Sequence, residues 1–242
     1  MLITRASNPR IKKIGKIRQR KSEKNKVLLV GTKAIKTAQK KLPMDTYITT
    51  KKIGGRRPKA KKVLVVTKEI MKKITNVKSP QDVAAIFELP DEKIKGSKYV
   101  LILDNISDPG NMGTVIRSAN AFQFDLIICS KHSTDPYSEK ALSAAKGSTF
   151  FIPIKIFTEE EILDFIDENN LNVYLAHIKG KPIDKVEFEP PLALIISNEA
   201  HGPSGWAKNI AKQFTIPIKK DIDSLNAAIA ASISMYEIKK IR

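Results

Sequence analysis

The sequence is poor in the residues that mark disulfide-rich and metal-binding proteins. It contains 1 cysteine, 3 histidines and 1 tryptophan among 242 residues. Cys129 lies in the apolar run 126–129, cannot form an intrachain disulfide, and is typical of a buried core thiol in a reducing, cytoplasmic setting. Because His132, His177 and His201 are not spaced as a metal site, we expect no metal.

Long hydrophobic runs are also missing. No apolar run approaches the roughly 20 residues that a membrane helix requires, so we expect no membrane partner. The opening residues MLITRASNPRIKKIGK contain no continuous apolar stretch of the kind found in signal peptides. Their basic character leaves an organellar transit segment open if the source is eukaryotic, although Asn8 and Pro9 are typical of a helix start within a fold.

Acidic residues are scarce in the first part of the chain. Residues 1–98 hold 28 lysines and arginines against 7 acidic residues, a net charge of 28 − 7 = +21. Residues 99–242 hold 15 against 18, or 15 − 18 = −3, which completes the total of +18. A generally lysine-rich composition would enrich both parts. The asymmetry therefore predicts nucleic-acid binding by the first part, since clustered cations bind phosphates and release counterions.

Hydrophobic periodicity predicts two α/β domains. In the first part we expect strands at 27–30, 47–50, 63–66 and 83–87 and helices at 8–21, 32–41 and from residue 68. In the second part we expect strands at 99–103, 125–129, 152–156, 172–176 and 192–197 and helices at 111–122, 137–146, 159–168, 204–212 and 224–240. The second pattern predicts a parallel sheet covered by helices, with ligands at the carboxyl ends of its strands. Composition changes at the polar stretch 89–98, so we predict a basic domain at 1–90, a linker at 91–98 and a second domain at 99–242.

The stretch DNISDPGNMGTVIRSANAF, residues 104–122, joins a strand, a glycine-containing turn and a helix. A dinucleotide fingerprint would need a third glycine after Gly110 and Gly113 and an acidic residue ending the next strand. Both are missing, which argues against a nicotinamide-dependent oxidoreductase. From this stretch alone, two explanations are equally good. Asn111 is a helix cap and Arg117 a surface residue, or both are site residues.

Two later stretches add to the pattern. ALIISNEAHGPS (193–204) is an apolar strand followed by a polar loop, and FTIPIKKDIDSLNAAIAASISMYEI (214–238) reads as a short strand at 216–217 and an alanine-rich helix for which Ser224 could be the N-cap. Together the three stretches resemble the motifs of the SpoU branch of the SPOUT RNA methyltransferases. The matching positions are Asn111, Gly113, Arg117, Asn198, Glu199, Gly202, Pro217, Ser224, Leu225 and Asn226.

The resemblance implies a C-terminal parallel-sheet SPOUT domain with a trefoil knot, and a homodimer. It also implies an N-terminal ribosomal-protein-like RNA-binding domain, whose likeness lies in SNPRIKKI and VLLVGTKAIKTA. The implied reaction moves a methyl group from S-adenosyl-L-methionine to a ribose 2′-hydroxyl of RNA, which identifies the nucleic acid as RNA. Large-subunit ribosomal RNA is the expected substrate.

The family motifs also assign roles by resemblance. Arg117 would be the main catalytic residue, acting electrostatically because an arginine is hard to deprotonate. The residues that would order the site around it are Asn111, Glu199, Ser224 and Asn226. The cofactor would lie near Ser197, Asn198, Gly202, Ile216 and Leu225. Phosphate contacts are expected from the first helix and the basic loop 51–62, through Lys12, Lys13, Lys16, Arg18, Arg20, Arg56 and Arg57.

The chain departs from the family pattern in places. Ser197 stands where glycine is common, and its side chain could crowd the cofactor. This departure keeps a catalytically inactive ribosome-associated RNA-binding protein open as an alternative. A tRNA 2′-O-methyltransferase is a second alternative. The sequence does not name the modified nucleotide.

Overall fold

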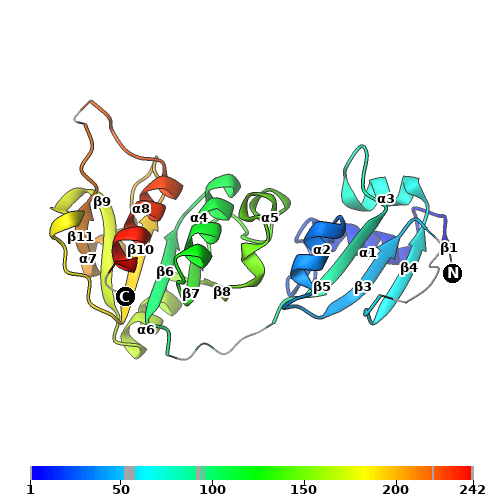
Figure 1. The fold of residues 1–242 in the computed structure, drawn as a ribbon, viewed down its shortest axis with the longest axis horizontal. Coiled ribbons are helices and arrows are strands. Elements are labelled where there is room, and N and C mark those ends of the chain that lie inside the picture. Colours follow the sequence, from blue (N-terminus) through cyan, green and yellow to red (C-terminus); the bar gives the residue numbers. More distant parts are fainter. Residues whose placement is uncertain (1, 52–57, 91–93, 95, 220, 241–242) are drawn as a thin grey trace. The chain divides into compact units, whose positions relative to one another are not determined.

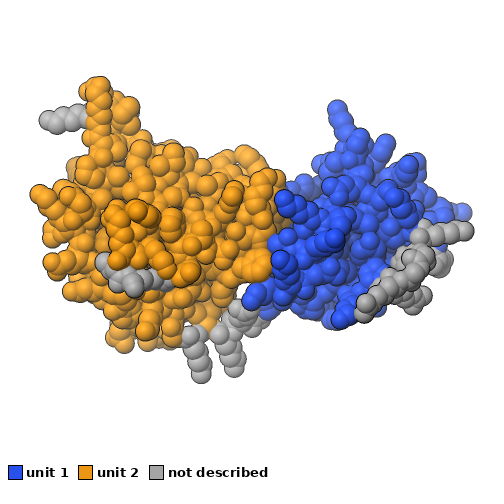
Figure 2. All heavy atoms as spheres, viewed as in Figure 1, with its two compact units in different colours: residues 1–92, 137–139 blue, residues 93–136, 140–242 orange. Residues whose placement is uncertain are grey.

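The computed structural model describes residues 2–51, 58–90, 94, 96–219 and 221–240, which form two α/β units (Figures 1 and 2). The first unit comprises residues 1–92 with 137–139, and the second comprises 93–136 and 140–242. The linker predicted at 91–98 stays a prediction, because several of its residues lie outside the described ones. No helix in the described part of the chain is long and apolar enough to cross a bilayer.

The first unit is a five-stranded mixed sheet with helices on it. Its strand order is β1-β4-β3-β5-β2, and β5 runs antiparallel to both neighbours. Its elements are β1 (Leu2–Ile3), α1 (Pro9–Arg18), β2 (Lys26–Val30), α2 (Thr32–Ala38), β3 (Met44–Thr49), β4 (Lys62–Val66), α3 (Lys68–Thr75) and β5 (Val83–Glu88). Ile11, Ile14 and Ile17 bury one face of α1 against α3 and the sheet. The helix ends at residue 18 rather than the expected 21, and Arg20 has a positive φ of 59°.

The second unit is a six-stranded sheet of parallel strands in the order β11-β9-β10-β6-β7-β8, as expected. Its strands are β6 (Tyr99–Asp104), β7 (Leu126–Ser130), β8 (Ile154–Phe157), β9 (Asn172–Pro182), β10 (Leu192–Ser197) and β11 (Lys212–Thr215). Its helices are α4 (Pro109–Ala121), α5 (Glu139–Ala145), α6 (Glu159–Glu168), α7 (Gly205–Ile210) and α8 (Ala227–Lys239), with short 3-10 turns at Ser148–Phe150 and Ile183–Lys185. Side chains of α4, α5 and α8 pack on one face and those of α6 and α7 on the other. Burial on both faces explains the continuous apolar strands.

Two expected elements near the third motif were misplaced. The strand expected at 216–217 lies earlier, as β11, and Phe214 is its buried residue. Pro217 has no backbone N–H and is a poor strand residue for that reason. The last helix begins at Ala227, and its cap is Asn226 rather than Ser224, because the Asn226 Oδ1 accepts a hydrogen bond from Ala228 N at 2.9 Å.

Gly113 of the first motif has a packing role. A Cβ at this position would lie 2.2 Å from the carbonyl oxygen of Ala141 and 2.9 Å from the nitrogen of Ala145. Both atoms belong to the α5 backbone, which a rotamer change cannot move. The glycine therefore lets α4 and α5 approach closely, and no nucleotide is needed to explain it.

Candidate active site

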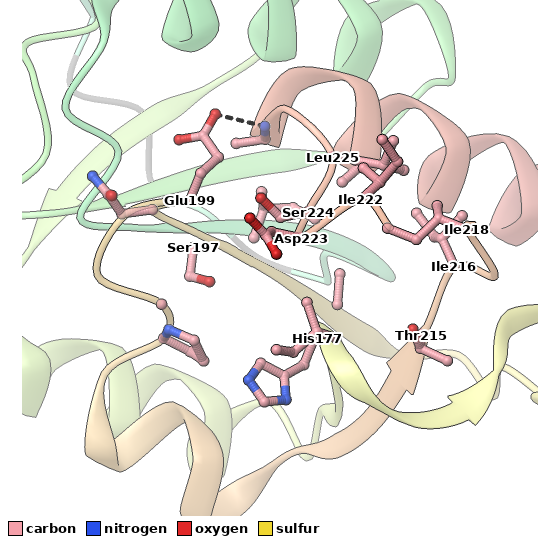
Figure 3. A pocket seen from close by; sticks show the side chains of 18 of the residues that line it. His177, Ser197, Glu199, Thr215, Ile216, Ile218, Ile222, Asp223, Ser224 and Leu225 are labelled. Carbon is pink, nitrogen blue, oxygen red and sulfur yellow. Dashed lines mark hydrogen bonds between the residues drawn. The ribbon is translucent and has the colours of Figure 1, made fainter. Parts of the chain in front are cut away.

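A cavity of about 430 Å³ lies at the carboxyl ends of β10 and β11, beside the middle of β9 (Figure 3). Its walls come from residues within 176–178, which lie in β9, within 196–203, at the end of β10 and in the loop after it, and within 215–230, from the end of β11 into α8. The volume falls in the range of about 300–1,000 Å³ typical of small-molecule sites. Its position is the one at which parallel sheets bind ligands.

The cavity gathers all five residues expected at the cofactor. They are Ser197, Asn198, Gly202, Ile216 and Leu225. Glu199 and Ser224, expected to order the site, line it as well. Residues of the second and third motifs, which are separated in the sequence, thus meet at one cavity.

Asn198 shapes the loop after β10. Its side-chain amide donates to the Asn105 carbonyl at 3.1 Å and to Ser107 Oγ at 2.9 Å, and its Oδ1 accepts from Ala200 N at 2.8 Å. The Gly202 backbone N–H donates to the Asn198 carbonyl at 2.9 Å, and Gly202 has a φ of 67°, which favours glycine. The Asn198 side chain therefore joins the loops after β6 and β10.

Glu199 connects the first motif to the last helix. Its Oε1 accepts from Asn111 Nδ2 at 2.8 Å and from the backbone N–H of Ala227 at 2.7 Å (Figure 3 draws the second bond). Asn226 Nδ2 donates to Asn111 Oδ1 at 3.0 Å, which closes the network. A carboxylate at a helix N-terminus is favoured by the helix dipole as well as by the hydrogen bond. The network holds three of the residues expected to order the site.

Arg117 is placed differently. It lies on α4, is exposed, and does not line the cavity. Within the described part of the chain its guanidinium makes no hydrogen bond or ion pair. The structure therefore leaves this cation available to an anion from outside the chain and places it outside the lining of the cavity.

Asp104 is a site-supporting residue that the sequence analysis missed. It ends β6, is fully buried, and accepts hydrogen bonds from Ser204 N at 2.8 Å and Ser204 Oγ at 2.7 Å. These bonds fix the start of α7 next to the cavity loop. An acidic residue directly after an apolar strand was the available signal. His177 and Asp223 also line the cavity and were not singled out.

The charges around the cavity are mixed. Glu199 and Asp223 line it with Lys219, which forms an ion pair with Asp221 at 2.7 Å. At the start of α4, the hydrogen bond from the Asn111 backbone N–H, together with Lys140, holds the pKa of Asp108 below its usual value. Among the described residues, no group of three His, Cys, Asp or Glu side chains is arranged to hold a metal ion.

The expected RNA-binding residues of α1 fall into two groups. Lys12, Lys13 and Lys16 are exposed, and Lys13 pairs with Glu23 at 3.1 Å. The accessible lysines of α1 can meet phosphates.

The arginines that follow them are engaged in the first unit itself. Arg18 pairs at 3.1 Å with Glu139, the first residue of α5, which is grouped with the first unit, and Arg20 donates to the carbonyl oxygens of Lys24, at 2.7 Å, and Lys26. Arg56 and Arg57 lie outside the described residues.

The fold is that of an α/β protein with a cavity at the carboxyl ends of two parallel strands, β10 and β11. The model of the SpoU rRNA Methylase family matches residues 98–236, and that of the MRM3-like substrate binding domain matches residues 8–85. The chain belongs to the SpoU rRNA methylase family, which confirms the resemblance of the three motifs.

Individual relatives agree with this assignment. The 23S rRNA (guanosine(2553)-2′-O)-methyltransferase RlmP of Bacillus subtilis is 29% identical over 177 residues, covering 72% of this chain and 71% of the relative. Human rRNA methyltransferase 3, mitochondrial, is 24% identical, covering 94% and 70%. The AdoMet-bound rRNA methyltransferase from Sinorhizobium meliloti superimposes with a TM-score of 0.83 at 28% identity, over 100% of this chain and 98% of that one.

The capping contacts of Asn226 predict a measurable effect on stability. Asn226→Ala removes the cap of α8 and should lower the free energy of unfolding by about 1 kcal/mol. Asn226→Ser keeps a capping oxygen and should recover most of this loss. Urea unfolding followed by the fluorescence of Trp206, the 1 tryptophan of the chain, measures both. Equal unfolding midpoints for wild type and Asn226→Ala would contradict the capping role.

Proposed function

We propose that this chain transfers a methyl group from S-adenosyl-L-methionine to a ribose 2′-hydroxyl of large-subunit ribosomal RNA. The observation that carries the proposal is the cavity in which the second and third family motifs meet, joined to the first through Glu199 and Asn111. The names of the relatives support the reaction and the class of RNA.

The cavity fits the cofactor in size and chemistry. Ile216 and Leu225 offer apolar walls to the adenosine, and the carboxylates of Glu199 and Asp223 suit a molecule with a cationic sulfonium and amine. Ser197 lines the cavity without filling it, so its departure from glycine leaves room for a ligand. When bound, the cofactor supplies an already activated methyl group.

Arg117 has the chemistry required on the RNA side. A guanidinium remains protonated and binds phosphate through paired N–H donors. Placed beside the target nucleotide, it would hold the phosphate and stabilise the 2′-oxygen as its proton leaves. Asn111, Glu199, Ser224 and Asn226 would keep α4 and α8 in the geometry that this step needs.

The first unit would hold the RNA. Its match to a substrate-binding domain and the charge of 28 − 7 = +21 over residues 1–98, of which it holds 1–92, support this role. Lys12, Lys13 and Lys16 of α1 are the described members of the proposed phosphate-binding set, with Arg56 and Arg57 as further members. Arg20 would act mainly by shaping the loop that follows the helix, and Arg18 by its ion pair with Glu139.

A homodimer in the cytoplasm completes the proposal. Ile229 and Tyr236 of α8 are 53% and 52% exposed, and their spacing of seven residues puts them on one face of the helix. Large exposed apolar side chains on one face suit an isologous interface.

Arg117→Ala should reduce methyl transfer to large-subunit ribosomal RNA about 100-fold or more, since removing one preorganised electrostatic donor has effects of this size. Labelled methyl transfer to large-subunit RNA and, separately, to bulk tRNA measures it. Lys208→Ala, which removes an exposed cation from α7, is the control and should transfer at the wild-type rate. Label in tRNA alone would overturn the substrate, and no label in either RNA would favour the inactive RNA-binding protein.

Lys12→Ala and Lys16→Ala should each weaken RNA binding without changing sequence preference. Each should also lower the slope of log affinity against log salt by about 0.7–0.9, because one fewer counterion is released. Filter binding at several salt concentrations measures the slopes. Lys185→Ala, an exposed cation of the second unit, is the control. Unchanged slopes for both α1 variants would place the RNA on another face.

Light scattering should give twice the mass of one chain for the wild type. Tyr236→Lys should shift the protein toward monomer, because the interface would have to bury an unpaired charge. Ile156→Lys alters a β8 residue of similar exposure, 47%, and should remain dimeric. A monomeric wild type would contradict the proposed dimer.

A further inference from the structure

The first unit contains a second cavity, of about 440 Å³, between α1 and the ends of the strands where β2, β3 and β4 begin. Its apolar lining comes from Ile14, Ile17 and Ile86, which are buried, and from Val63 and Leu64, which are half-buried. The polar lining residues are Arg10, Lys13, Glu23, Lys26, Asp45, Thr46 and Lys62. An apolar cleft with a few converging polar groups is the usual form of a small-molecule site.

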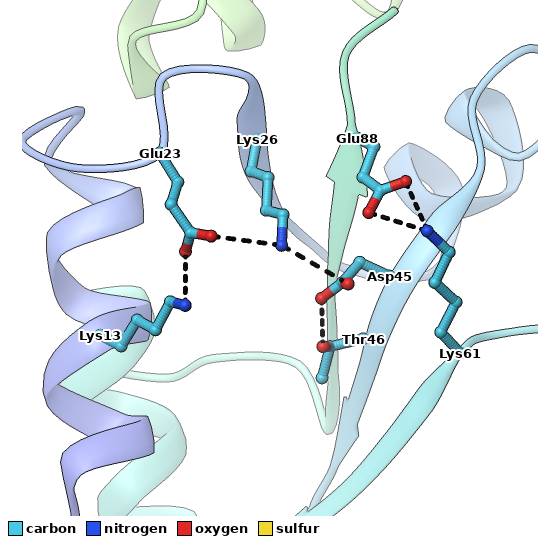
Figure 4. Close-up of polar contacts among 7 residues, drawn as sticks. All are labelled: Lys13, Glu23, Lys26, Asp45, Thr46, Lys61 and Glu88. Atoms are coloured by element: carbon cyan, nitrogen blue, oxygen red, sulfur yellow. Dashed lines mark hydrogen bonds and ion pairs between the residues drawn. The ribbon is translucent and has the colours of Figure 1, made fainter.

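A chain of charges runs along this cavity (Figure 4). Glu23 lies 3.1 Å from the Lys13 ammonium and 3.4 Å from that of Lys26, and Lys26 lies 3.5 Å from Asp45 Oδ1. Thr46 Oγ1 donates to Asp45 Oδ2 at 2.7 Å. The Asp45 side chain is only 10% exposed, so its carboxylate is a buried group that faces a cavity.

The two carboxylates stay charged at neutral pH. Burial acts to raise the pKa of Asp45, but the Thr46 hydroxyl and the charge of Lys26 outweigh it and hold that pKa below its usual value. Burial is likewise outweighed at Glu23, whose pKa is lowered by Lys13 and Lys26. Among the described residues, Asp45 Oδ1 meets only the Lys26 ammonium, at 3.5 Å. An ionised carboxylate has about four acceptor sites, so this one has unused capacity.

The lining selects a particular kind of ligand. Apolar walls suit a flat ring, a carboxylate suits adjacent N–H donors, and the exposed cations Arg10, Lys13 and Lys62 suit a phosphate. Guanine presents two neighbouring donors, N1–H and the 2-amino group, on its Watson–Crick edge, whereas adenine and uracil do not. Proteins read unpaired bases on this edge.

We infer that this cavity binds the base of an unpaired guanosine nucleotide of the RNA substrate, with its edge on the Asp45–Glu23 carboxylates and its phosphate among the exposed cations Arg10, Lys13 and Lys62. The site is separate from the cavity proposed for methyl transfer. Its occupant rests on the proposed function, because the RNA is the expected source of the nucleotide. Binding of the nucleotide itself requires neither the cofactor nor transfer.

Calorimetric titration of the full chain with 5′-GMP, 5′-IMP and 5′-AMP tests the inference. IMP keeps N1–H and lacks the 2-amino group, so GMP should bind about tenfold more tightly than IMP, the effect of one charge-assisted hydrogen bond. Lys62→Ala should weaken GMP binding about three- to fivefold, as expected for one exposed cation. Val63→Trp fills the cavity without changing charge and should abolish binding. Lys40→Ala, an exposed lysine of the same unit away from the cavity, should bind as wild type.

The source of the nucleotide is tested with single-stranded RNA carrying one guanosine or one inosine. Preference for the guanosine RNA, lost in Val63→Trp, supports the inference. Binding of free GMP without this preference would make the site one for a free nucleotide and overturn the RNA assignment. Equal affinities for GMP, IMP and AMP, or binding unaffected by Val63→Trp, would overturn the site. Methyl transfer, measured in parallel, decides the proposed function separately, since a chain without transfer could still bind GMP in this way.

Discussion

The cavity in the second unit depends on the acceptor oxygen of one carboxylate. Glu199 Oε1 accepts from Asn111 and from the first backbone N–H of α8, residues 88 and 28 positions away in the sequence. Without this oxygen, the Ala227 N–H at the helix start would have no hydrogen-bond acceptor. The desolvation cost of an unsatisfied donor is larger than the net free energy that a hydrogen bond contributes to stability. The loop after β10 and the start of α8 are therefore held in one arrangement, and both are walls of the cavity.

Similar polar contacts hold the neighbouring loops of the cavity. Asp104 holds Ser204 through two bonds across 100 residues, and Asn198 holds the loops after β6 and β10 together. In each case a polar side chain at the end of a buried parallel strand pairs with backbone from a distant segment. The strands beneath are rigid because they are buried on both faces, so the geometry of the loops is set by these few polar contacts.

The sequence predicted the elements, and the residues that gather at the cavity, more completely than it predicted the contacts among them. Apolar strands and motif order were enough to bring Ser197, Ile216 and Leu225 to one cavity, since carboxyl ends of parallel strands share an edge. The Asp104–Ser204 bonds join distant segments, and no local pattern encodes such a pair. The cap of α8 shows why a helix start is hard to predict from the sequence. Serine and asparagine are both good N-cap residues, so the sequence does not decide between Ser224 and Asn226. In the structure Asn226 is the cap, and its side chain also donates to Asn111.

Charge illustrates why composition must be combined with burial. The first 98 residues carry 28 cations against 7 anions, yet these cations differ in what they can bind. Arg20 donates to backbone carbonyls within its own unit, and Lys26 is shared between two carboxylates. The exposed Lys12 and Lys16 have the accessibility that phosphate binding requires. The net charge therefore predicts the class of partner, whereas the pairing of each cation determines which residues remain accessible to bind it.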